Sequence, residues 1–209
     1  MEILSQQNNW LVTSGLKPLG MHEIAIQEAR SDWQDDARAL LTYVLRYISA
    51  AGNRILPQET MNYGSWLLKF TLGRDSLLEV HEYDASGIDF VPGAKLSMEF
   101  WRDQQRICHS AGAAFDLPRP DQLAALSPDL MQASVVEGVR YNLRDPMSGW
   151  ILTSKGYDGP VNALRREHIW HLATWRRDLI RYLALPVGYR FWTDGEASIR
   201  FDAGVATAR

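Results

Sequence analysis

Two histidines three residues apart, His168 and His171, are the first candidates for chemistry in this 209-residue sequence. They lie in the stretch EHIWHL (167–172), and two imidazoles at that spacing on one helix face can bind one metal ion or act as an acid–base pair. A zinc site needs three or four protein ligands, and the HExxH arrangement is absent because no glutamate lies between the histidines. We interpret both as partly buried residues bonded to neighbouring strands, and a metal or catalytic role stays open as the alternative.

A second group of polar side chains lies in EVHEYD (79–84) and in the stretch DASGID that follows. On a strand, Glu79 and His81 share one face while Glu82 and Asp84 share the other, so each face offers two metal ligands at most. Alternating polar residues are typical of a solvated strand. We expect an acidic rim that steers a basic protein partner, formed by Glu79, Glu82, Asp84 and Asp89.

Other catalytic motifs are missing from the sequence. It contains no GxSxG, P-loop or dinucleotide fingerprint, and Cys108 is the only cysteine, which excludes an internal disulfide and a cysteine zinc cluster. We predict no catalytic residues, no cofactor and no metal. The net charge of −3 argues against a nucleic-acid partner.

The elements that position these residues follow from hydrophobic spacing. Apolar residues at steps of three and four predict a helix over 32–51, and the segments WLLKFTL and SLLEVHEY predict a hairpin within 64–83. A helix is expected near 97–111. The proline-containing segment 112–133 is interpreted as a connector with one helical turn and as the best candidate for a domain boundary.

The C-terminal part of the sequence predicts two strands within 134–157, a long helix near 160–181 and a closing hairpin, YRFWT with SIRF. The last residues, AGVATAR, are interpreted as a frayed tail. On the predicted helix, His168 and His171 fall on the apolar face, whereas Arg166, Trp170 and Arg177 project together from the opposite face. A tryptophan between arginines is typical of a binding hot spot.

Together these elements predict an α+β protein, because strands and helices come in runs rather than in strict alternation. An N-terminal half, 1–125, with a helix and an antiparallel hairpin, is expected to pack on a small C-terminal domain, 134–203, with one central helix and antiparallel strands. The sequence shows no signal peptide and no membrane-spanning run, so we expect a cytoplasmic protein without a membrane partner.

The stretch MSGWILTSKGYDG, followed by RRDLIRYLALPVGYRFWTDGE, resembles a bacterial family of predicted immunity proteins, number thirty-three among them. The matching positions are Ser148, Gly149, Trp150, Asp178, Leu179, Tyr182, Leu183, Pro186, Gly188 and Phe191. Leu179 stands where the family often has proline. The resemblance covers 134–203 and implies a protein that protects a bacterium by binding a cognate toxin effector and occluding its active site.

The sequence leaves two specific functions open, beside that of a plain scaffold or oligomerisation module. The first is an immunity protein without enzymatic activity, whose partner is a toxin protein. The alternative is a small metal-dependent enzyme that uses His168, His171 and the acidic residues near 79–84. The sequence does not indicate an oligomeric state.

Overall fold

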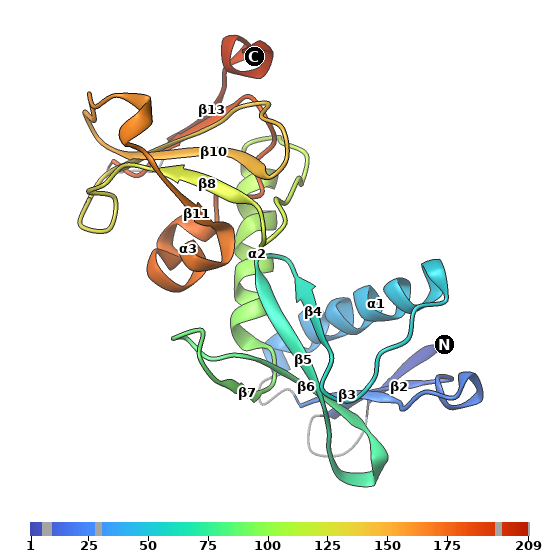
Figure 1. Ribbon diagram of the computed structural model, residues 1–209. Coiled ribbons are helices and arrows are strands. Elements are labelled where there is room, and N and C mark those ends of the chain that lie inside the picture. The colour runs from blue at the N-terminus through green and yellow to red at the C-terminus, as the bar shows by residue number, and fades with distance from the viewer. Residues whose placement is uncertain (6–9, 28–30, 195–197, 209) are drawn as a thin grey trace. The chain divides into compact units, whose positions relative to one another are not determined.

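The structure is a computed structural model of the chain, and it describes residues 1–5, 10–27, 31–194 and 198–208. The chain divides into two compact units, Met1–Glu99 and Phe100–Arg209, and each unit has its own sheet (Figure 1). Both units combine helices with strands, so the predicted α+β class is confirmed.

The elements follow one another along the chain with short connections. The strands are β1 Glu2–Ser5, β2 Trp10–Ser14, β3 Ile24–Gln27, β4 Thr60–Tyr63, β5 Trp66–Leu72, β6 Leu78–Tyr83, β7 Phe90–Pro92, β8 Leu123–Leu126, β9 Val136–Arg140, β10 Met147–Ser154, β11 Arg165–His168, β12 Tyr189–Trp192 and β13 Ser198–Phe201. The α-helices are α1 Gln34–Ala51, α2 Lys95–Ser110, α3 Ile169–Trp175, α4 Arg177–Ile180 and α5 Ala203–Thr207. The described 3-10 helices are η2 Lys17–Leu19, η3 Ser31–Trp33, η4 Arg74–Ser76 and η5 Val161–Ala163.

In the N-terminal unit, helix α1 packs its apolar side against a sheet with the order β1-β2-β3-β6-β5-β4, and β7 extends this sheet beside β6 (Figure 1). The predicted helix is confirmed, and it ends at Gly52 in the left-handed conformation, with φ of 61°. Its most deeply buried residues are Ala37, Leu40, Leu41, Val44 and Ile48, each at most 3% exposed. Each large aliphatic side chain buried here contributes about 1.5–3 kcal/mol to stability.

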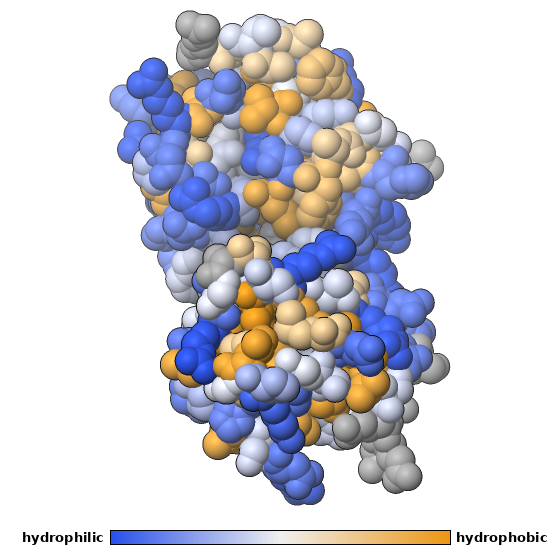
Figure 2. All heavy atoms as spheres, turned by 90° about the vertical axis from the view of Figure 1, so that its right-hand side faces the viewer, coloured by the Kyte–Doolittle hydropathy of each residue, from blue (hydrophilic) through white to orange (hydrophobic). Residues whose placement is uncertain are grey.

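The predicted hairpin is also confirmed, because β5 and β6 are antiparallel with Leu68 opposite Glu82 and Phe70 opposite Val80. On the face that Figure 2 shows, apolar side chains of the N-terminal unit gather among polar ones. Exposed apolar residues of this unit include Met1, Leu4, Leu19 and Leu56. The unit therefore presents apolar as well as acidic surface.

In the C-terminal unit, the sheet has the order β11-β8-β10-β9-β12-β13. The two predicted strand pairs are confirmed, with β9 antiparallel to β10 and β12 antiparallel to β13. The turn predicted between β12 and β13 includes residues 195–197, which lie outside the described residues. Strand β8 is an addition: it lies within the expected connector 112–133 and pairs with β10 in parallel.

The predicted long helix over 160–181 is wrong. Residues 165–168 form β11, which is antiparallel to β8, and the chain then enters the short helices α3 and α4 (Figure 1). The reason is tertiary: β8 presents an open edge, and backbone pairing along that edge outweighs the helical spacing of apolar residues. The expected frayed tail is likewise helical, because the Asp202 carboxylate caps α5 through the N–H groups of Gly204 and Val205.

Within the described part of the chain, no helix is both long enough and apolar enough to cross a membrane.

Candidate functional site

Three of the four residues of the expected acidic rim lie at or near the surface, and the fourth is buried. Glu79 on β6 is half-exposed, and Asp89 is exposed in the segment between β6 and β7. Asp84, which directly follows β6, accepts hydrogen bonds at Oδ1 from the Ser86 N–H at 3.0 Å, the Ser86 hydroxyl at 2.7 Å and the Ile88 N–H at 3.2 Å. These bonds, the one from the Ser86 hydroxyl first, lower the pKa of Asp84. The turn therefore holds a charged carboxylate at the surface.

Glu82 does not belong to this exposed rim. Its side chain is 3% exposed and shares the core-facing side of β6 with Leu78 and Val80. The carboxylate accepts hydrogen bonds from the Leu96 N–H at 2.8 Å, from the Ser97 N–H at 2.7 Å and from the Ser97 hydroxyl at 2.7 Å. Glu82 thus caps the first turn of α2, where a negative charge also meets the positive end of the helix dipole. Burial nevertheless raises its pKa against these bonds.

The two candidate histidines lie at the junction between β11 and α3. His168 ends β11 and is exposed, whereas His171 lies in the first turn of α3 and is half-buried. Their ring centroids are 5.5 Å apart, and His171 Nδ1 lies 3.2 Å from Glu167 Oε2. The expectation that both face the core from one helix is therefore wrong. Among the described residues, no group of three or more His, Cys, Asp or Glu side chains is placed to hold a metal ion.

The predicted trio Arg166, Trp170 and Arg177 is spread over three elements. Arg166 lies on β11, Trp170 on α3 and Arg177 on α4, so the helical face that was expected to unite them does not exist. Trp170 is 39% exposed, as expected of a surface residue. The aromatic contact of Trp170 is with His171 on the same helix.

Trp170 and Trp175 instead frame His171 on α3. The imidazole lies 3.9 Å from the Trp170 ring and 5.0 Å from the Trp175 ring, centroid to centroid, and it stacks on Trp175 with an interplanar angle of 15°. Trp175 is 51% exposed. The exposure of Trp175 was not predicted, because on the expected long helix Trp175 falls on the same apolar face as His168 and His171. Two exposed indoles held by a shared neighbour are the kind of group that anchors protein interfaces.

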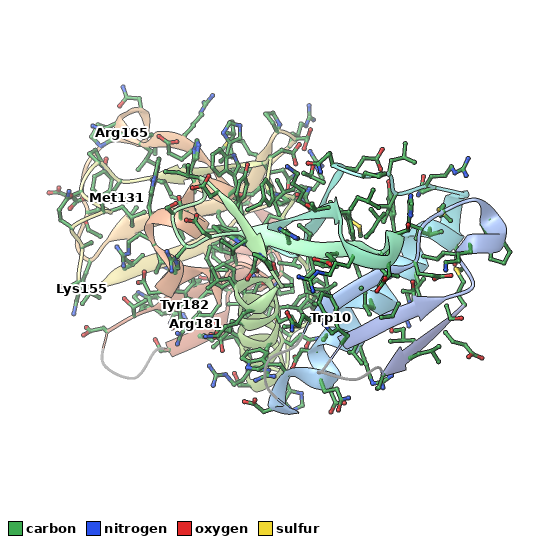
Figure 3. The ribbon with its side chains drawn as sticks, turned by 90° about the horizontal axis from the view of Figure 1, so that it is seen from below. Trp10, Met131, Lys155, Arg165, Arg181 and Tyr182 are labelled. Carbon is green, nitrogen blue, oxygen red and sulfur yellow. The ribbon has the colours of Figure 1, made fainter. Side chains whose placement is uncertain are left out.

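A groove of about 510 Å³ lies beside Trp175. Its lining residues are Leu126, Ser127, Pro128, Met131, Arg165, Glu167 and Trp175. Figure 3 shows Arg165 and Met131 on the same outer side of the C-terminal unit, from β11 and from the segment after β8. The groove therefore joins a strand, a helix end and a loop.

The loop that forms one wall of the groove is held from two sides. Arg176 Nη1 donates hydrogen bonds to the carbonyl groups of Leu130 and Ala133, at 2.5 and 3.1 Å. Asp178 in turn fixes Arg176 through two parallel bonds of 2.9 and 2.7 Å. These bonds lower the pKa of the Asp178 carboxyl. The Ser154 hydroxyl donates to Asp129 at 2.6 Å on the other side of the loop.

Most of the residues that carry the family resemblance stabilise the fold. The Ser148 hydroxyl donates to the Leu123 carbonyl at 2.8 Å, and the indole N–H of the fully buried Trp150 donates to the Leu183 carbonyl at 3.0 Å. Gly149 has φ of 89°, and a Cβ at this position would lie 2.1 Å from the Tyr141 carbonyl oxygen. The S-G-W sequence therefore joins β10 to β8 and to the segment after α4.

Most residues of the second matching segment, 178–191, pack into the same core. Tyr182 stacks on the buried Phe191 at 4.2 Å with an interplanar angle of 14°, and Leu179 and Leu183 are fully buried. Gly188 has φ of 92° and leaves no room for a side chain against Phe201. The motif is thus a signature of the fold, and Asp178 is the member that connects it to the groove through Arg176.

A comparison with protein families finds a match in the C-terminal part of the chain. Residues 103–202 match the family model of the Imm33-like domain, an immunity-protein family. The resemblance stated for 134–203 is therefore confirmed, and the matched region begins earlier, within α2. A search of curated proteins and a search of solved structures each found no match. The C-terminal unit contains the whole matched region, with the groove and α3 inside it.

Proposed function

We propose that this chain is an immunity protein that binds a cognate bacterial toxin effector and occludes the toxin's active site. The observation that carries the proposal is the match of residues 103–202 to the Imm33-like domain. In support, most of the motif residues lie in the core, which leaves the surface of this unit to recognise a partner. The proposed site of action is the cytoplasm of the protected cell.

The surface around α3 is the proposed main contact. Trp170 and Trp175 are exposed, and their contacts with His171, tilted for Trp170 and stacked for Trp175, restrict both rings before a partner arrives. A rigid aromatic side chain loses little conformational freedom on binding, and burying it contributes the largest share of affinity in many interfaces. The location of both indoles within the matched region 103–202 favours this surface over the acidic rim.

The exposed part of the acidic rim is proposed as a steering surface. Glu79, Asp84 and Asp89 remain near the surface of the N-terminal unit, whereas Glu82 is excluded because its carboxylate is buried at α2. Toxin domains that act on anionic substrates carry basic clefts, and an acidic partner surface accelerates encounter with such a cleft. The rim is therefore expected to change the association rate more than the dissociation rate.

The test uses a candidate toxin domain from a gene adjacent to that of this chain, produced in bacterial cells with and without the full chain. The proposal predicts that the full chain restores growth and forms a complex with the purified toxin domain. The triple reversal E79K/D84K/D89K should slow association and weaken its salt dependence, while Trp170→Ala with Trp175→Ala should accelerate dissociation. A folded chain that neither binds this domain nor protects the cells would contradict the proposed function.

A further inference from the structure

Strand β11 has an open edge. It pairs on one side with β8, in the register Arg165 to Leu126 through His168 to Leu123, and it ends the strand order of its sheet. None of the described strands pairs with its other side. Alternate residues of such a strand direct backbone N–H and C=O groups outward, where an extended chain can bind them.

The groove next to this edge has a fixed shape. Arg165 and Glu167 of β11 line it together with Met131 from the loop after β8 and Trp175 from α3. The Met131 wall is held by Arg176, whose side chain is only 12% exposed and which donates to two carbonyl groups of the loop. The groove therefore needs little reorganisation before it accepts a side chain.

The charge of this edge is positive. Arg165 and Arg166 are exposed, and neither forms an ion pair with a carboxylate of the described residues. The Glu167 carboxylate is already bonded to His171. Two guanidinium groups at adjacent strand positions point to opposite faces of the sheet, so they favour a strand that carries acidic side chains on both faces.

We infer that β11 accepts an extended acidic segment of the partner as an added strand, with one apolar side chain of that segment in the groove between Met131 and Trp175. This inference rests on the proposed function, because the partner is the toxin. The backbone pairing supplies affinity, the groove selects an apolar side chain, and Arg165 and Arg166 select the acidic neighbours.

A second copy of the chain fits this edge less well. In an antiparallel pairing of two β11 strands, the register that brings Arg165 opposite Glu167 also brings the two Arg166 side chains opposite each other. The neighbouring register brings the two Glu167 side chains together. Like charges directly opposite one another destabilise a strand pair, so the charge pattern favours a different, acidic chain.

The experiment measures hydrogen exchange of the full chain with and without the adjacent-gene toxin domain, and affinity for the same domain by calorimetry. The expected result is exchange slowed by about tenfold or more at the outward amides of Arg165–His168. The variant R165E/R166E should bind about 10- to 100-fold more weakly. The matched control R144E/R200E, which makes the same charge change at exposed arginines away from β11, should bind as the unmodified chain does.

The outcomes separate the two proposals. A complex in which β11 exchanges as before and R165E/R166E binds normally overturns the added strand but leaves the immunity function standing. A folded chain that binds no toxin domain overturns both. Light scattering on the chain alone completes the test, since a dimer with a protected β11 in the absence of toxin would assign this edge to a second copy.

Discussion

Trp175 stacks on His171 with ring centroids 5.0 Å apart, yet half of the Trp175 surface stays exposed. Such an arrangement restricts a large apolar side chain without burying it. Stability alone does not require it, because an exposed indole contributes little to the core. Trp175, which also lines the groove, is therefore the side chain that the proposed partner is expected to bury.

The first prediction concerns this indole. Trp175→Ala should weaken binding of the toxin domain by about 2 kcal/mol or more, because a partly desolvated aromatic anchor is lost. Calorimetric titration measures the change. The control is Phe201→Ala, which removes an aromatic ring of similar exposure from the opposite edge strand β13. Equal losses in both variants would show that the effect is not specific to the groove.

The second prediction separates fold from binding. Gly149→Ala should lower the free energy of unfolding by about 2–4 kcal/mol, because the new Cβ collides with the Tyr141 carbonyl and the backbone must keep a positive φ. Urea unfolding measures it. Gly156→Ala is the matched control: Gly156 has φ of 76° with no atom within 4 Å of the added Cβ, so only the conformational cost of about 1 kcal/mol is expected. A Gly149→Ala variant as stable as this control would contradict the packing described at β10.

The third prediction is a pH dependence that arises from Glu82. Burial raises its pKa above the ordinary value of 4.5, so the folded state binds the proton more tightly than the unfolded state. The stability linked to this proton is fully present below pH 4.5 and is lost as the pH rises through the folded pKa. The unmodified chain should therefore lose more unfolding free energy than Glu82→Gln between pH 4 and pH 8. Parallel pH profiles for the two proteins would show that Glu82 does not titrate as described.

The fourth prediction concerns the groove wall. Arg176→Lys should accelerate hydrogen exchange in the loop 130–133, because one ammonium group cannot bond both loop carbonyls while pairing with Asp178 in two parallel bonds. Affinity for the toxin domain should fall with it. Unchanged exchange in this loop would mean that its shape does not depend on Arg176.

Local sequence patterns predicted the elements whose stabilising contacts are close in sequence. Helix α1 has a continuous apolar stripe and a glycine stop, and the β5–β6 hairpin has two apolar strands around a short turn. The two strands expected within 134–157 are present as β9 and β10. In each case the hydrophobic spacing and the turn residues favour the same structure.

The errors arose where a distant partner decides the structure. The sequence LAAL of β8 contains no β-branched residue, so it does not resemble a strand, and without β8 the residues of β11 have no edge to pair with. Glu82 looked solvated because charged and apolar residues alternate along β6, and its burial depends on the N–H groups of α2 that reach it in the folded unit. The exposure of Trp175 was not predicted either, because the expected long helix is replaced by β11 and the short helix α3.

The most direct test of the proposed immunity function is the affinity of the full chain for a candidate toxin domain from an adjacent gene, measured by calorimetry together with the growth of cells that produce both. The prediction is a stoichiometric complex of micromolar or tighter affinity, with Trp175→Ala weakening both binding and protection while the chain stays folded. A folded chain that shows no heat of binding in a titration capable of detecting micromolar complexes, and that leaves the toxin lethal, would contradict it.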